Sequence, residues 1–350
     1  MKKKGLLITF SIILVITAGL IVTGILYNAQ INAQPSFTGE YDINHNQPLY
    51  VMKADETETL YLQGENGGVH KLYEADENLK IMSPIFTGES EVSFILTNGP
   101  PEAPPGEQEF QLVHSNVLTY DVEEEELTTN LEARGYITNL LYDQAEQHMI
   151  VSGVHVSTEG EPEPGFISFA SALYTLTKDG NFEKIHDFDA YEPGSLQITE
   201  NGEKLYMILP DDFEDVSPDS MFEATERIYE MAIDQPKEMT VVSQPDNQVP
   251  ISEFVLLEQE NKLLYQTIIN FNEGENYLYD YVWFDLTNQE EGERLHIDEA
   301  SENAKTNENW LYYTKTTDKA DQTKVYKLYR YDLLRDTGEE EIELRVEPEE

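Results

Sequence analysis

Five carboxylates stand close together between Asp211 and Asp219, within the polar stretch from Pro210 to Thr225. Hard cations bind several oxygen donors from closely spaced, flexible residues, so the stretch is a candidate calcium loop. It lacks the glycine that an EF-hand loop needs for its sharp turn. In a chain with 68 acids, a solvated acidic surface is the simpler interpretation, and we expect no cofactor besides this speculative Ca²⁺. The candidate ligands are Asp211, Asp212, Glu214, Asp215 and Asp219.

No established catalytic motif accompanies these acids. The seven histidines form no His-x-x-x-His pair and no zinc-ligand spacing. The sequence has neither a Gly-x-Ser-x-Gly elbow nor a glycine-rich phosphate loop. Two carboxylates about 5–10 Å apart could hydrolyse a glycosidic bond, but the sequence selects no pair among so many acids. We therefore assign no catalytic residue.

Charge limits the partners. The chain has 22 basic and 68 acidic residues, and three of the lysines lie at positions 2–4. The remainder carries a formal charge of −49, from 19 basic and 68 acidic residues. Such a surface repels nucleic acid, so we expect no nucleic-acid partner. The chain has no cysteine, which excludes disulfides and thiolate chemistry.

The elements that must position these residues form a repeat, in which a polar turn leads into a short apolar strand. Its clearest copy begins at Asn201-Gly202, a pair that predicts a type I′ turn. Six copies occur, and their marker residues are 34, 56, 55, 59 and 47 residues apart. A period of roughly 40–50 residues with several short strands indicates propeller blades. The markers are Leu60, Phe94, Ile150, Leu205, Leu264 and Leu311.

A second landmark supports four strands in each repeat. After every marker comes another strand that ends on an acid, followed by a turn and one more short strand. We expect an all-β, six-bladed β-propeller, with a β-sandwich or a β-solenoid as the alternative. The acids are Asp76, Asp121, Asp179, Asp234, Asp285 and Asp332.

The copy from Ile198 to Met207, Ile-Thr-Glu-Asn-Gly-Glu-Lys-Leu-Tyr-Met, resembles the repeat of TolB-like propellers. That repeat runs Ser-Pro-Asp-Gly-Lys and continues into an apolar strand. The Ser-Pro pair is missing from all six copies here. The resemblance extends as a pattern over roughly residues 48–346, and it implies a six-bladed propeller without implying a function.

The N-terminus predicts a membrane anchor. Residues 5–27 carry no charge and follow three lysines. As a helix these residues would be ~34 Å long, enough to cross a bilayer, with the lysines on the cytoplasmic side. We expect a cytoplasmic tail (1–4), one transmembrane signal anchor (5–27), a tether (28–47) and an extracytoplasmic propeller (48–350). A cleaved signal peptide, whose apolar region is usually about 7–15 residues, is the alternative.

The blades differ mainly in the loops between their second and third strands. In a four-strand meander these loops emerge on one face, and binding sites usually lie on loops of a rigid scaffold. We expect a non-enzymatic binding or scaffolding protein of the cell membrane, single-pass, that engages an envelope protein or peptide through these loops. The alternative is a carbohydrate-active or other hydrolytic propeller that uses channel carboxylates. Both functions remain open at this point, because one fold can serve many functions.

The excess of negative charge leads to a prediction about salt. Salt screens repulsion beyond about 8–10 Å at physiological strength, so a soluble domain made without residues 1–28 should gain thermal stability from low to moderate salt. NaCl and CaCl₂ are compared at equal ionic strength in thermal unfolding. Equal gains mean screening alone, which is the result we expect. A larger gain with calcium, lost when Asp211, Asp212 and Asp215 are replaced by Asn, would establish the cation loop. A melting temperature that does not change with salt would contradict the argument that the acidic side chains repel one another.

Overall fold

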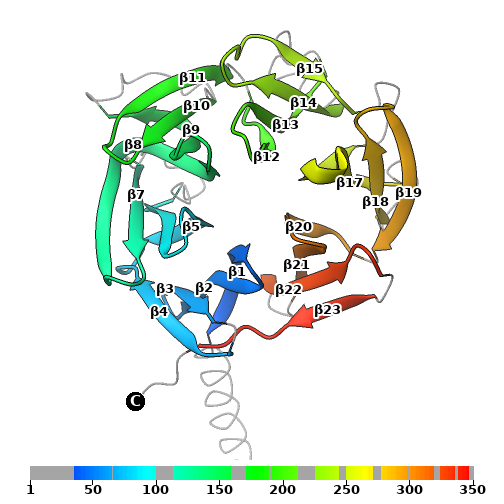
Figure 1. The fold of residues 1–350 in the computed structure, drawn as a ribbon. Coiled ribbons are helices and arrows are strands. Elements are labelled where there is room, and N and C mark those ends of the chain that lie inside the picture. Colours follow the sequence, from blue (N-terminus) through cyan, green and yellow to red (C-terminus); the bar gives the residue numbers. More distant parts are fainter. Residues whose placement is uncertain are drawn as a thin grey trace, which may run out of the picture.

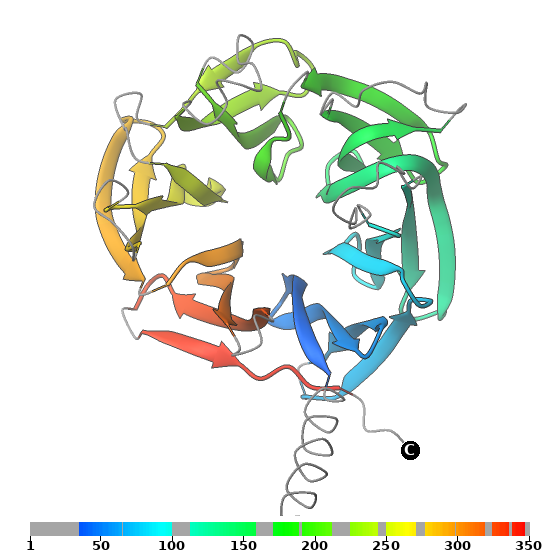
Figure 2. The same ribbon diagram turned by 180° about the vertical axis from the view of Figure 1, so that it is seen from behind.

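The chain forms a ring of six blades around a central channel (Figures 1 and 2). The computed structural model describes residues 35–64, 66–99, 113–158, 171–188, 191–211, 225–243, 250–270, 277–297, 299–318, 324–335 and 338–346. These residues contain 23 strands and one short 3₁₀ turn, η1 (Glu258–Glu260). The predicted all-β propeller is confirmed.

Each blade is an antiparallel meander that runs from the channel outward. The first three blades contain β1 (Ser36–Asn44), β2 (Gln47–Ala54), β3 (Thr57–Gln63) and β4 (Val69–Glu74), then β5 (Lys80–Phe86), β6 (Glu91–Thr97), β7 (His114–Asp121) and β8 (Glu126–Asp143), then β9 (His148–Ser157), β10 (Ser171–Thr177) and β11 (Phe182–Phe188). The other three contain β12 (Gly194–Ile198), β13 (Lys204–Pro210), β14 (Glu226–Ala232) and β15 (Met239–Val241), then β16 (Ile251–Leu257), β17 (Lys262–Ile268), β18 (Tyr279–Asp285) and β19 (Glu290–Ile297), then β20 (Ser301–Asn307), β21 (Trp310–Asp318), β22 (Lys324–Asp332) and β23 (Glu339–Ile342).

Strand β8 belongs to two blades. Its first half pairs with β7 as the outer strand of the second blade, and its second half pairs with β9 as the inner strand of the third. The two blades therefore form one seven-stranded sheet. The change of partner occurs at Gly135, whose φ of 106° is open to glycine but strained for other residues.

The marker residues are buried between the blades, because apolar second strands face the neighbouring blades. Five of the six markers lie on second strands as predicted: Phe94, Ile150, Leu205, Leu264 and Leu311. The sixth, Leu60, lies on the third strand of the first blade. Its pairing partner Val51, on the second strand, occupies the position equivalent to the other markers. The distance in sequence from the first marker position to Phe94 is therefore 43 residues instead of 34.

The first blade thus begins earlier than predicted. Strand β1 lies within the predicted tether (28–47), and two tight hairpins follow it in succession. Both hairpins present a polar turn before an apolar strand, so the repeat pattern alone could not tell the second strand from the third. The first hairpin contains the type I′ geometry, with positive φ at both His45 and Asn46. At the predicted type I′ site only Gly202 has positive φ.

The acids that end the third strands have a local role. The carboxylate of Asp121 accepts hydrogen bonds from the amides of Glu123 and Glu124. Asp285 and Asp332 each accept two amides in the same way. In these three blades the carboxylate fixes the turn that leads to the fourth strand, which explains the second sequence landmark there. In the first blade the landmark acid, Asp76, instead follows the fourth strand, β4.

The ring closes without an exchange of strands, since the first and sixth sheets are each continuous in sequence. The segment after β23 instead reaches the first blade (Figure 2). There Leu344 and Val346 pack against a cluster that includes Phe37 and Tyr312. The hydroxyl of Tyr50 donates a hydrogen bond to the carbonyl of Arg345. Closure therefore depends on side-chain packing and on this C-terminal segment.

No helix among the described residues is long and apolar enough to cross a membrane. The predicted tail (1–4), anchor (5–27) and first part of the tether lie outside those residues.

The closure leads to a prediction. Replacing Leu344 and Val346 together by Ser should lower the free energy of unfolding by about 1–3 kcal/mol, because two partly buried apolar side chains are lost from the closing cluster. Thermal unfolding measures the change. Leu334→Ser is the control, because Leu334 is 69% exposed. An equal effect of both changes would show that the C-terminal segment does not close the ring.

Candidate functional site

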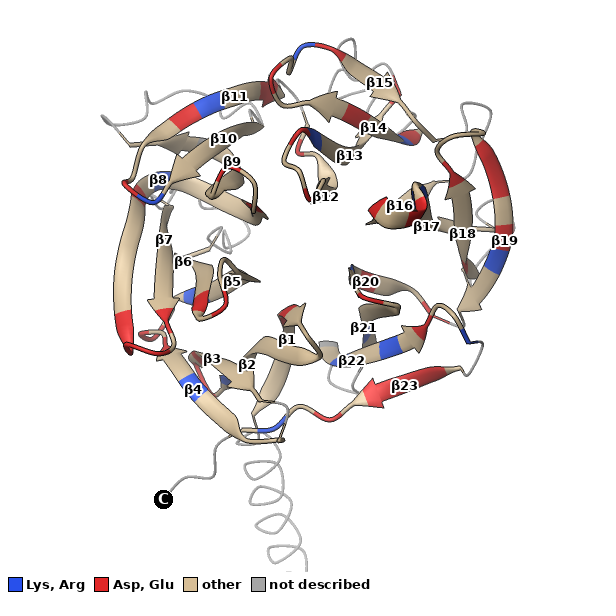
Figure 3. Cartoon of the chain, in the orientation of Figure 1, with Lys and Arg blue, Asp and Glu red and all other residues tan. Residues whose placement is uncertain are grey.

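One candidate site is the central channel, which contains a cavity of about 530 Å³. Residues from all six inner strands (β1, β5, β8, β12, β16 and β20) line it. Acidic residues recur on the strands around this opening (Figure 3). The cavity is lined by three carboxylates, Glu40, Asp42 and Glu253, and one cation, Lys305.

Every inner strand is bulged against the second strand of its blade, because the pairing register shifts at least once in each pair. A residue with positive φ lies at a register shift in five blades: Gly39, Ser83, Gly135, Ser195 and Asn303. A bulge leaves backbone groups without a partner inside the sheet. Those groups must therefore be satisfied by another part of the molecule.

Side chains of neighbouring blades satisfy them. Glu40 Oε2 on β1 accepts the amide of Ser83 on β5 at 2.8 Å. Ser83 Oγ in turn accepts the amide of Leu140 on β8 at 2.9 Å. Glu253 Oε1 on β16 accepts the amide of Ala304 on β20. The inner strands are therefore joined to one another by side chains that cross from one blade to the next.

Asp42 makes the same kind of bridge at the closure of the ring. It accepts the amide of Phe86 at 2.9 Å and pairs with Lys305 Nζ at 3.0 Å, so it joins the sixth, first and second blades. Lys305 Nζ also lies 5.5 Å from the centre of the Tyr41 ring. The Tyr41 hydroxyl donates to the carbonyl of Asn303 at 2.6 Å.

Burial changes the acidity of these bridging carboxyls. It raises the pKa of Glu40, and it raises the pKa of Glu58, which accepts the amide of Ile81 at 2.8 Å. At Glu253, which is 7% exposed, burial raises the pKa to about 8; the nearby Glu302 carboxylate adds to this shift and the Ala304 amide opposes it. Sequence reasoning missed all three residues. Their signal is an acid inside a strand, next to a small bulge residue in the cases of Gly39-Glu40 and Ser252-Glu253.

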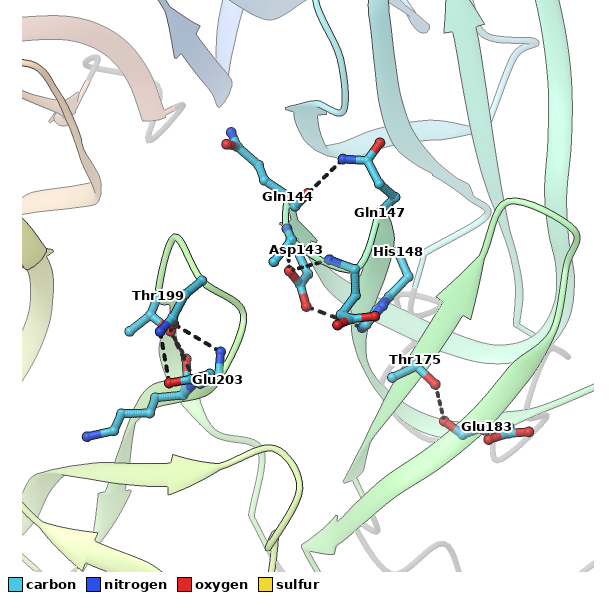
Figure 4. A network of polar contacts seen from close by, with 12 residues as sticks. Asp143, Gln144, Gln147, His148, Thr175, Glu183, Thr199 and Glu203 are labelled. Carbon is cyan, nitrogen blue, oxygen red and sulfur yellow. Dashed lines mark hydrogen bonds and ion pairs between the residues drawn. The ribbon is translucent and has the colours of Figure 1, made fainter.

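A polar cluster in the turn between β8 and β9 lies against the fourth blade (Figure 4). Asp143 is 1% exposed, and its Oδ1 accepts the amides of Ala145 and Glu146 at 2.9 and 3.2 Å. His148 Nε2 lies 3.7 Å from Asp143 Oδ2. A Cβ on Gly202 of the next blade would lie 2.3 Å from both carboxylate oxygens. The glycine of the clearest repeat is therefore required by a neighbouring blade as well as by its own turn.

Of the predicted cation loop, the structure describes Asp211 alone. Its carboxylate pairs at 3.2 Å with Arg227, a buried side chain. Asp212, Glu214, Asp215 and Asp219 lie outside the described residues. Within the described ranges, no group of three or more His, Asp or Glu residues is arranged to hold a metal ion.

The other candidate site is the face that carries the second-to-third-strand connections. In five blades the sequence insertions join a second strand to a third, as predicted; in the first blade that connection is a tight turn. Among the described residues, three of the five exposed large apolar side chains lie together at this end of the fifth blade: Ile269, Tyr277 and Leu278, each 40–44% exposed. The Ile269 amide donates to the Leu278 carbonyl at 3.0 Å, so the two positions are fixed side by side. We call these three residues the apolar tip.

The buried carboxyl leads to a prediction about pH. A carboxyl whose pKa rises from 4.5 to about 8 on folding favours the folded state below pH 4.5 and loses that contribution as the pH rises to about 8. Glu253→Gln keeps an acceptor for the Ala304 amide. Because a Gln side chain does not ionise, the variant should not lose this stability as the pH rises. The difference in stability between the variant and the wild type should therefore grow by a few kcal/mol from pH 5 to pH 8. Thermal unfolding at several pH values measures it, with the exposed Glu77→Gln as control. A difference that stays constant with pH would contradict the argument.

Comparison with known proteins supports the fold. No protein-family model matches the sequence, and no curated protein matches it by sequence. Among solved structures, TolB from Acinetobacter baumannii is similar with a TM-score of 0.50 and 11% identity, over 90% of this chain and 66% of that one. An oligogalacturonate lyase from Vibrio parahaemolyticus has a TM-score of 0.58 and 10% identity, over 88% and 79% of the two chains. An acylaminoacyl peptidase from Pyrococcus horikoshii has a TM-score of 0.51 and 15% identity, over 88% of this chain and 44% of that one. Identities this low establish the fold alone, and that fold is the β-propeller of TolB-like proteins.

Proposed function

We propose that this chain is a non-enzymatic binding protein of the cell membrane, held by an uncleaved helix over residues 5–27, with its propeller outside the cytoplasm. It docks an envelope protein or peptide on the face that carries the second-to-third-strand connections. The observation that carries the proposal is the apolar tip, because a cluster of exposed apolar side chains on a charged surface is typical of an interaction site.

The direction of the first strand supports this choice of face. The start of β1 pairs with the end of β2, since Ser36 lies opposite Lys53. The chain therefore enters the propeller on the same face as the second-to-third-strand connections. A tether of a few residues would hold this face toward the bilayer, so the partner would be a membrane-proximal protein or peptide.

The channel carboxylates also favour binding over catalysis. Glu40 and Asp42 each accept a backbone amide of a neighbouring blade, and Asp42 also pairs with Lys305. Groups committed to such bridges cannot move to a substrate without loosening the ring. The fold occurs in TolB, in a lyase and in a peptidase, so the fold itself does not decide between the two functions.

A carbohydrate-active or other hydrolytic propeller is the second candidate, and one observation favours it. Glu253 faces the channel cavity with a pKa of about 8, a value at which a carboxyl can act as a general acid. Glycoside chemistry needs a second carboxylate in a matching position. The other two channel carboxylates already serve the bridges, so we place this candidate second.

The proposal predicts the effect of changing the apolar tip. Ile269, Tyr277 and Leu278 are replaced together by Ser in the full-length chain, and intact cells without a wall are treated with a membrane-impermeant amine crosslinker. We expect the crosslinked partner species to fall at least about tenfold, because truncating a docking cluster typically costs more than about 1.4 kcal/mol.

The matched control is the double change Leu127→Ser and Leu334→Ser. These exposed side chains lie beside third-to-fourth-strand hairpins, on the opposite face. The control should keep the crosslinked species, and both variants should melt within a few degrees of the wild type. Equal loss in both variants, or no loss in the triple variant, would refute docking on this face. A propeller that the impermeant reagent never labels would refute its extracytoplasmic location.

A further inference from the structure

Three side chains form a row across the strands of the sixth blade. The guanidinium carbon of Arg330 on β22 lies 4.5 Å from the centre of the Trp310 ring on β21. On the other side, Arg330 Nε and Nη2 donate to Glu340 Oε2 on β23 at 2.9 and 2.8 Å. An aromatic ring, a cation and a carboxylate therefore follow one another over the second, third and fourth strands, and the row is complete within the chain.

The fifth blade has a related row that lacks its last side chain. Trp283 occupies the position of Arg330, since each lies two residues before the acid that ends its third strand. On the second strand Lys262 replaces the aromatic residue, and its Nζ lies 5.3 Å from the centre of the Trp283 ring. On the fourth strand stands Gly292, where an added Cβ would lie 3.5 Å from Trp283 Cβ. The ring and the cation are thus exchanged, and no side chain ends the row.

A bulge places this glycine beside the ring. The pairing of β18 with β19 shifts register at Trp283, so that Gly292 and Glu293 both stand opposite this one residue. A glycine inside a strand often marks a place that another group can approach closely. Gly292 is exposed and Trp283 is half-buried, and both line a groove of about 480 Å³ that extends to Leu333 of the sixth blade. The row of the fifth blade is therefore open to a group from outside the chain.

The charges of this groove favour a cation. Five carboxylates and one ammonium group, that of Lys262, line it, and acidic residues follow one another at the start of β19 (Figure 3). Lys262 already pairs with Glu260 at 3.0 Å. Glu290 and Glu293 are exposed, and neither pairs with a basic side chain of the described residues. An aromatic ring beside unpaired carboxylates complements a cationic group in both respects.

We propose that this groove binds an arginine side chain of a basic peptide or protein partner, with the guanidinium on Trp283 and its charge opposite Glu290 and Glu293. A guanidinium is planar and weakly hydrated, so it stacks on an aromatic ring and loses less hydration than an ammonium group does. The chain itself makes this contact at Trp310. The groove lies at the turn end of the blades, opposite the apolar tip, so this partner is a second one and the inference does not rest on the proposed function.

Nuclear magnetic resonance of the full-length protein in detergent micelles tests the proposal, because the chain has two tryptophans and isotope-labelled indole groups give one signal each. The probe is a short acetylated and amidated peptide with two arginines separated by a leucine. We expect a saturable shift of the Trp283 signal, which Trp283→Phe identifies, and none at Trp310. The same peptide with lysines should bind at least about threefold more weakly, and the uncharged citrulline form at least about tenfold more weakly.

Two glycine variants make a matched pair. Gly292→Leu should weaken binding of the arginine peptide at least about tenfold, because the new side chain takes the place of the guanidinium on the ring. Its Cβ makes an ordinary contact, so the fold should be kept. Gly68→Leu is the control, since Gly68 is an exposed glycine of the first blade and a Cβ there meets no atom within 4 Å. Both variants should melt within a few degrees of the wild type.

The outcomes separate this inference from the proposed function. The triple Ser variant of the apolar tip should bind the arginine peptide normally, whether or not it loses its own partner. Equal binding of the arginine and lysine peptides would mean general attraction to the acidic surface and would overturn the proposal. An unshifted Trp283 signal, or a Gly292→Leu variant that binds as the wild type does, would overturn it too. The peptide series on the wild type decides the matter even if Gly292→Leu fails to fold.

Discussion

The ring depends on side chains that cross between bulged inner strands. A bulge turns backbone amides out of their own sheet, and in water those amides would be solvated. Here a carboxylate or a hydroxyl of the neighbouring blade receives them, as Glu40 receives the amide of Ser83 and Glu253 that of Ala304. Because each bridge buries a titratable group, the inner ring gains fixed geometry at the cost of carboxyls whose pKa values are raised.

The few basic residues are used where they contribute most to this arrangement. Lys305 joins the sixth blade to the first, Arg227 pairs with Asp211 beside the fourth blade's second strand, and the buried Lys315 pairs with Glu339 at 2.6 Å. Basic side chains that form these ion pairs do not neutralise the negative charge of the surface. The excess of 68 acids over 22 basic residues therefore falls on the exposed faces and on the channel. A field of this sign favours cationic ligands and excludes polyanions.

The propeller has two surfaces with different physical characters. The channel is polar, and its cavity is lined by the buried carboxyl groups of Glu40 and Glu253 and by the ion pair of Asp42 and Lys305. The face with the second-to-third-strand connections includes the apolar tip, which suits a macromolecular partner. Similar folds occur in TolB, in a lyase and in a peptidase, so the argument for function must come from these surfaces and not from the fold.

The sequence by itself determined the class of fold, the number of blades and the place of the insertions. Those features depend on turns and apolar strands of about ten residues. Such local patterns can be recognised in the sequence without knowing which segments lie beside them in the folded protein. It misplaced the first blade by one strand because two tight hairpins in succession look alike. It could not select Glu40, Glu58 or Glu253, since an isolated acid in a weakly apolar strand looks like any exposed residue. Their partners are 23 to 51 residues away, and the contacts that close the ring span more than 260 residues. Only tertiary structure decided which acids are buried, because burial depends on blades that the local sequence does not contain.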